Sequence, residues 1–149
     1  MDPWLDQWAL KLSDGETPPD RNKLLLIDDQ TEILENLKEY LELDGFKVTI
    51  ATSGNNLLNR VMELKPDLIV CDVMMPGISG HEVLQVLRGS PVTSQIPFIF
   101  SSSSSELIKM TEALAMGAND YLVKPFDPEE LLMAIKSLLK LGNKNPTVV

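Results

Sequence analysis

Apolar positions follow two different periods that alternate along the chain from residue 23 onward. Short, nearly continuous apolar runs are typical of strands buried on both faces, whereas apolar residues at every third or fourth position are typical of amphipathic helices. The first pattern predicts strands at residues 23–27, 68–71, 96–100 and 121–123, and alternation around Val48 and Ile50 predicts a further strand at residues 46–51. The second pattern predicts helices at residues 31–43, 55–64, 81–88, 106–116 and 127–141.

Regular alternation of strands and helices predicts an α/β fold. We expect a doubly wound, five-stranded parallel sheet in the order 2-1-3-4-5, with right-handed crossovers and helices on both faces. Ligands of such sheets bind beyond the carboxyl ends of the strands, near the point where the strand order reverses. In this order the reversal lies between the first and third strands, so polar residues at strand ends are the first functional candidates.

The two ends of the chain depart from this pattern. Trp4 and Trp8 lie on the apolar side of a predicted short amphipathic helix, which a proline-rich linker follows. That helix is interpreted as a cover for its own domain, as a partner-binding helix or as a frayed tail. We expect a helical extension over residues 1–22, one domain over residues 23–141 and a tail over residues 142–149.

Charge and composition narrow the class of protein. A net charge of −9 disfavours direct contact with nucleic acid, because the chain has no basic stretch to neutralise phosphates. No apolar run reaches the roughly 18 residues of a membrane-spanning helix, and the N-terminus lacks the pattern of a secretory signal. The single cysteine, Cys71, lies in an apolar strand and cannot form an internal disulfide. The expected protein is soluble and cytoplasmic, with no membrane or nucleic-acid partner.

Four predicted strand ends carry polar side chains, namely Asp28 and Asp29, then Asp72, Ser102 and Lys124. Carboxylates gathered in one crevice repel each other and need a cation, and oxygen ligands without His or Cys favour Mg²⁺. A carboxylate such as Asp72 beside Mg²⁺ can attack a phosphoryl group and become an acyl phosphate. Lys124 and Ser102 could then stabilise the transferring oxygens. Taken singly, the paired acids could cap a helix and Lys124 could be an ordinary surface lysine, so the prediction depends on their joint placement.

The motifs around these residues resemble the receiver domain of two-component response regulators. The resemblance covers residues 23–141 and is carried by LIDD ending at Asp29, DVMMPGISG starting at Asp72, PFIFSS ending at Ser102 and GANDYLVKPF starting at Gly117. It implies a flavodoxin-like receiver fold. It also implies a signalling protein that promotes only its own phosphorylation and dephosphorylation, rather than an enzyme with a separate substrate.

The resemblance assigns a role to each motif residue. It implies that Asp72 is the phosphoacceptor, that Lys124 pairs with the phosphoryl group, and that the Lys124–Pro125 peptide bond is cis. Mg²⁺ would be held by Asp28, largely through water, and by Asp29, Asp72 and the backbone carbonyl of Met74. Ser102 and Tyr121 match switch positions that would remodel the face formed by the fourth helix, the fifth strand and the fifth helix.

The resemblance further implies that a histidine kinase or a phosphotransfer protein donates the phosphoryl group. The downstream partner or output domain is not identified by the sequence, and a homodimer that forms on phosphorylation is compatible with it. Two other functions are considered. A phosphatase with an aspartyl-phosphate intermediate usually needs a second acid two residues past the nucleophile, where this chain has Met74. A metal-free interaction module would differ from a receiver in its response to Mg²⁺ and beryllofluoride.

Overall fold

The computed structural model describes residues 23–140, so the expected N-terminal extension and C-terminal tail lie outside the described residues. Five parallel strands form one sheet in the order β2-β1-β3-β4-β5, which confirms the predicted topology. The strands are β1 (Lys23–Ile27), β2 (Lys47–Ala51), β3 (Leu68–Asp72), β4 (Phe98–Ser102) and β5 (Asp120–Val123). Within residues 23–140, no helix is both long and apolar enough to span a bilayer.

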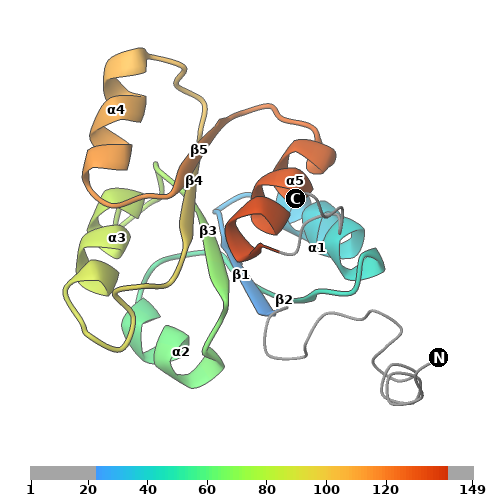
Figure 1. The fold of residues 1–149 in the computed structure, drawn as a ribbon, viewed down its shortest axis with the longest axis horizontal. Helices are drawn as coiled ribbons and strands as arrows, with labels where there is room; N and C mark the ends of the chain where they lie inside the picture. The colour runs from blue at the N-terminus through green and yellow to red at the C-terminus, as the bar shows by residue number, and fades with distance from the viewer. Residues whose placement is uncertain (1–22, 141–149) are drawn as a thin grey trace.

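Helices cover both faces of the sheet, as Figure 1 shows. One face packs against α1 (Thr31–Leu43) and α5 (Pro128–Leu139). The opposite face packs against α2 (Leu57–Leu64), α3 (Gly80–Arg88) and α4 (Leu107–Ala115). Every residue of β3 and β4 is buried, which explains why these strands are apolar at successive positions rather than at alternate ones.

The fourth strand lies two residues later than the sequence predicts. The expected range was 96–100, whereas β4 spans Phe98–Ser102. Pro97 lies just before the strand, where its missing N–H costs no ladder hydrogen bond. At the other end, Ser101 and Ser102 pair with β5. The sheet ladder therefore overrides the preference of serine for turns, and Ser102 is the last residue of the strand rather than the first residue after it.

The rest of the serine run, residues 103–105, forms the loop between β4 and α4 (Leu107–Ala115). The side-chain oxygen of Ser102 accepts a hydrogen bond from the Ser104 amide at 3.1 Å. The Ser104 hydroxyl accepts one from the Glu106 amide at 3.3 Å. These local bonds satisfy backbone donors that a loop leaves without ladder partners. The loop delivers the chain to α4, which begins one residue later than predicted.

Candidate functional site

Three carboxylates meet at the carboxyl ends of β1 and β3, which are neighbours in the sheet. Asp72 is the last residue of β3, and Asp28 and Asp29 directly follow β1. One carboxylate oxygen from each of the three lies within 4.8 Å of the others. Asp28 and Asp72 are only 4% and 7% exposed, whereas Asp29 is exposed. The structure thus brings together the acids that the sequence placed at separate strand ends.

Lys124 directly follows β5 and reaches across to these acids. Its ammonium group donates a hydrogen bond to Asp28 Oδ2 at 2.7 Å and lies 3.4 Å from Asp72 Oδ1. The following Lys124–Pro125 peptide bond is cis. One lysine therefore contacts two of the three clustered carboxylates, and negative charge exceeds positive charge at this end of the sheet.

The pKa values of Asp72 and Lys124 reflect this excess of negative charge. Burial raises the pKa of Asp72 above its ordinary value, the charge of Asp28 raises it further, and Lys124 only partly opposes these effects. Burial alone would lower the pKa of Lys124, but its hydrogen bond and charge interaction with Asp28, together with the charge of Asp72, leave the pKa raised. A divalent cation bound by carboxylate oxygens would relieve the repulsion, and this donor set fits Mg²⁺.

Local backbone structure holds the two buried acids in place. The Asp28 carboxylate accepts a hydrogen bond from the Gln30 amide at 3.0 Å, which closes the turn between β1 and α1. On the other side, the Gly80 amide donates to the Val73 carbonyl at 2.8 Å. A Cβ atom at Gly80 would collide with the backbone carbonyl of Asp72, so glycine lets α3 begin directly against the end of β3.

The Ser102 and Tyr121 side chains are not bonded to the acid cluster. Among the described residues, the Ser102 hydroxyl forms no hydrogen bond with the three carboxylates or the Lys124 ammonium group. A backbone hydrogen bond connects Ser102 to Lys124 instead, because the Lys124 amide donates to the Ser102 carbonyl at 2.7 Å. The buried Tyr121 hydroxyl donates to the Ser104 carbonyl at 3.1 Å. Ser104 is therefore a shared hydrogen-bond partner of Ser102 and Tyr121. The only feature of the sequence that indicates this role is the position of Ser104, two residues past Ser102 in a turn.

Arg88 is a second cation that sequence reasoning missed. It donates to the Gly117 carbonyl from Nε at 3.2 Å and from Nη2 at 2.9 Å. It also donates to the Ile96 carbonyl at 2.9 Å and to Asn119 Oδ1 at 3.2 Å. Burial lowers the pKa of the guanidinium. These acceptors lie in the loop between α3 and β4 and in the loop between α4 and β5. No local sequence motif predicts contacts between such distant segments.

Cys71 lies beside the acid cluster in sequence but is fully buried in the apolar core. Burial raises the pKa of its thiol, and the charges of Asp72 and Asp28 raise it further. The thiolate is therefore suppressed, and Cys71 acts as a small apolar side chain.

Comparison with known proteins matches this geometry to one family. The model described as the response regulator receiver domain matches residues 24–136. The chain belongs to the response regulator receiver domain family. A receiver domain of this family is part of a two-component signalling protein, which confirms the function class that the motifs indicated.

Two solved receiver structures and one curated relative illustrate the similarity. The Francisella response regulator 1452 receiver domain is 33% identical, with a TM-score of 0.74 and coverage of 80% of this chain and 97% of that one. The BeF₃-activated receiver domain of Klebsiella pneumoniae RstA is 28% identical, with a TM-score of 0.74 and coverage of 80% and 99%. The DNA-binding response regulator MtrA of Mycolicibacterium paratuberculosis is 32% identical over 126 residues, which are 85% of this chain. The chain spans about half of the length of MtrA, 55%.

Receiver domains generally bind Mg²⁺ at an acidic pocket and are phosphorylated by histidine kinases. In this structure Asp28, Asp29 and Asp72 form a cluster of carboxylates that could hold a metal ion.

Proposed function

We propose that Asp72 of this receiver domain accepts a phosphoryl group and so acts as the input of a signalling switch. One observation carries the proposal: three carboxylates and Lys124 converge at the carboxyl end of the sheet, and Asp72 lies 3.4 Å from the ammonium group. A structural ion pair would need only one carboxylate per lysine. The excess of acids is costly unless the site serves a cation and an oxyanion.

The chemistry proposed at Asp72 is a displacement at phosphorus. A carboxylate oxygen of Asp72 forms a bond to the phosphorus atom, and the bond from phosphorus to the donor nitrogen of a phosphohistidine breaks. The bonding electron pair leaves with the donor imidazole, and Asp72 becomes an acyl phosphate. Later attack of water on the same phosphorus atom releases the carboxylate and inorganic phosphate.

The residues that would hold Mg²⁺ are Asp28, Asp29, Asp72 and the backbone carbonyl of Met74. When bound, Mg²⁺ supplies positive charge that neutralises the carboxylates and the phosphoryl oxygens. Lys124 orients and neutralises a second phosphoryl oxygen as a point charge. Its present bond to Asp28 keeps the ammonium group within reach of Asp72.

Ser102 and Tyr121 are proposed to transmit the change. A phosphoryl group on Asp72 would offer new acceptors to the Ser102 hydroxyl and to Lys124. Charge-assisted hydrogen bonds contribute about 1.5–3 kcal/mol each, and two of them approach the roughly 5.5 kcal/mol that reverses a 1:99 equilibrium. Because Tyr121 is bonded to the Ser104 carbonyl, movement of Ser102 would reach the face formed by α4, β5 and α5.

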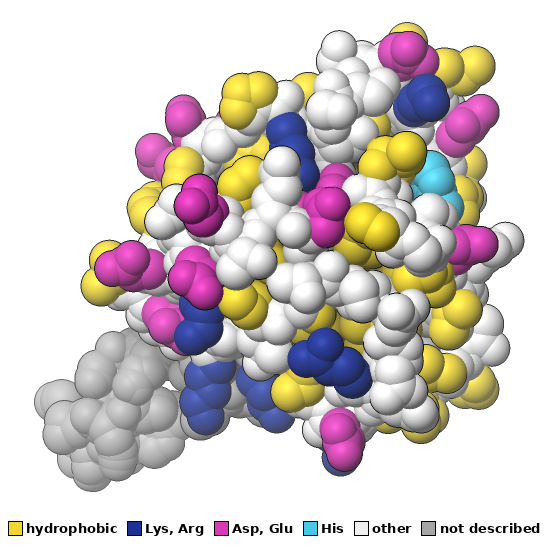
Figure 2. Space-filling view, turned by 180° about the vertical axis from the view of Figure 1, so that it is seen from behind, with side chains coloured by type: hydrophobic (Ala, Val, Ile, Leu, Met, Phe, Trp, Pro, Cys, Tyr) yellow, Lys and Arg dark blue, Asp and Glu magenta, His cyan; other side chains and the backbone are white. Residues whose placement is uncertain are grey.

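We propose a histidine kinase or a phosphotransfer protein as the phosphoryl donor, acting in the cytoplasm. A homodimer that forms on phosphorylation through α4, β5 and α5 is included in the proposal. MtrA is named as DNA-binding, and we propose that such an activity resides outside the receiver domain. Figure 2 shows one face of the molecule, on which Lys and Arg side chains lie in separate groups among Asp and Glu side chains, and this distribution supports the proposal.

Labelling by acetyl phosphate tests the proposal. The protein should gain one phosphoryl group in the presence of Mg²⁺ and none after chelation by EDTA. Asp72→Asn should abolish labelling, because an amide cannot form the acyl phosphate. Asp44→Asn is the matched control, since Asp44 follows the far end of α1 and pairs with Lys136 at 3.1 Å. Labelling that persists in Asp72→Asn, or that ignores EDTA, would refute the proposal.

A further inference from the structure

A pocket of about 510 Å³ opens between α1 and α5, on the side of β1 and β4 opposite the α3 and α4 helices. Its wall is largely apolar and includes Leu26, Ile33, Leu34, Leu37, Val70 and Phe126. Small-molecule sites are usually apolar clefts of about 300–1,000 Å³ with a few polar groups that fix orientation. The pocket has the size and the wall of such a site.

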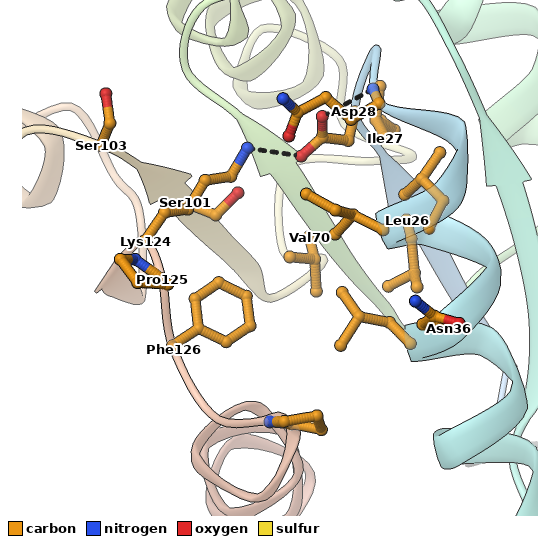
Figure 3. Close-up of a pocket in the computed structure, with 15 residues that line it drawn as sticks. Leu26, Ile27, Asp28, Asn36, Val70, Ser101, Ser103, Lys124, Pro125 and Phe126 are labelled. Atoms are coloured by element: carbon orange, nitrogen blue, oxygen red, sulfur yellow. Dashed lines mark hydrogen bonds and ion pairs between the residues drawn. The ribbon is translucent and has the colours of Figure 1, made fainter.

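The Ser101 hydroxyl is the polar group inside this pocket. Ser101 is only 3% exposed, and it lines the pocket from β4. Figure 3 shows its oxygen pointing into the space between Lys124 and Val70. Across residues 23–140, the Ser101 side chain forms no hydrogen bond. A buried hydroxyl without a hydrogen-bond partner is unfavourable, so its presence indicates a ligand group that forms a hydrogen bond with it.

The charges at the rim indicate what kind of ligand fits. Asp28 and Lys124 both border the pocket, but they are bonded to each other at 2.7 Å and so offer little net charge to a third group. The Phe126 ring lies in the wall, as Figure 3 shows, and aromatic rings pack favourably against one another. A neutral aromatic molecule is therefore favoured over an ion.

We propose that the pocket between α1 and α5 binds a small, neutral aromatic molecule whose N–H or O–H group donates a hydrogen bond to the Ser101 hydroxyl. Ser101 lies on the opposite side of β4 from Phe100 and Ser102, so the proposed hydrogen bond does not involve the Ser102 hydroxyl. The pocket is a second site of the receiver domain. Asp28 and Lys124 at its rim also belong to the site around the acid cluster.

Two matched probes test this site on the full chain, without Mg²⁺ or a phosphodonor. Indole carries an N–H donor, and N-methylindole has the same ring system without it. Isotope-labelled protein should show saturable shifts of the Val70, Ser101 and Phe126 amides with both probes. Indole should bind about three- to tenfold more tightly, the equivalent of one hydrogen bond. Absence of saturable shifts at millimolar indole, or equal affinity for the two probes, would overturn the proposal.

Variants then locate the hydrogen bond. Ser101→Ala should make the affinities for indole and N-methylindole equal while the pocket walls stay intact. Ser103→Ala is the control, because Ser103 carries a hydroxyl at the exposed rim of the same pocket. It should keep the preference for indole. If Ser101→Ala also keeps that preference, the assignment of Ser101 is wrong, whatever the outcome of acetyl phosphate labelling.

Discussion

Two partly buried cations, Lys124 and Arg88, hold the chain at opposite ends of β5, and their surroundings differ in kind. Lys124 follows β5 and faces two buried carboxylates that repel each other. Arg88 comes from α3 and donates hydrogen bonds to neutral oxygen atoms of Gly117 and Asn119, just before β5. One cation has more anionic partners than it can neutralise, and the other has a complete set of neutral acceptors.

This difference separates a contact that can be rearranged from one that is fixed. The lysine ammonium is a compact charge on a flexible stem, and a phosphoryl group or Mg²⁺ would redistribute its interactions. The guanidinium of Arg88 is a rigid fork, and its acceptor Asn119 Oδ1 also accepts from the Phe98 amide at 2.8 Å. We therefore expect change at the Lys124 end of β5 and constancy at the Arg88 end.

Removing Arg88 should have the largest effect on stability. Arg88→Ala leaves the carbonyls of Ile96 and Gly117 without this donor, and urea unfolding should show a loss of about 3 kcal/mol. Mg²⁺ should not restore this loss. Arg60→Ala is the control, since the Arg60 side chain makes no hydrogen bond or ion pair within residues 23–140, and it should stay close to wild type. A loss in Arg88→Ala no larger than that of the control would contradict the assigned role.

Removing Lys124 should have a smaller effect that depends on metal. Lys124→Met leaves Asp28 and Asp72 without a cation, and in EDTA it should destabilise the protein by about 2 kcal/mol. Saturating Mg²⁺ should recover more stability in this variant than in wild type, because the ion replaces the missing charge. Equal recovery in the two proteins would show that Lys124 and Mg²⁺ do not act on the same carboxylates.

Neutralising Asp72 should have the smallest effect, with the opposite sign. Asp72→Asn removes a repelling carboxylate and should stabilise the metal-free protein near neutral pH by about 1 kcal/mol. The folded protein holds the Asp72 proton more tightly than the unfolded chain, because its pKa is raised. The stability of wild type relative to the variant therefore falls as pH rises from the ordinary Asp value through the raised pKa. Urea unfolding at a series of pH values should show the gap closing in acid, and a gap that widens in acid would contradict the raised pKa.

Sequence reasoning predicted the sheet order and the meeting of Asp28, Asp29 and Asp72, because both follow from periodicity and from the common edge of parallel strands. It placed β4 two residues too early because Ser101 and Ser102 favour turns locally, whereas pairing with β5 keeps them in the sheet. It could not predict the Arg88 contacts, since their acceptors are mainly backbone carbonyls of distant loops. The metal, phosphoacceptor and switch roles of the individual residues stay predictions.

The most direct test of the central claim is to locate the phosphoryl group chemically. After treatment with acetyl phosphate and Mg²⁺, borohydride reduces an acyl phosphate to an alcohol, which converts a phosphorylated aspartate to homoserine. Peptide mass spectrometry should then find homoserine at position 72 and unmodified aspartate at positions 28 and 29. Homoserine at either of those positions, or a phosphoryl group that survives on the serines of residues 101–105, would contradict the account.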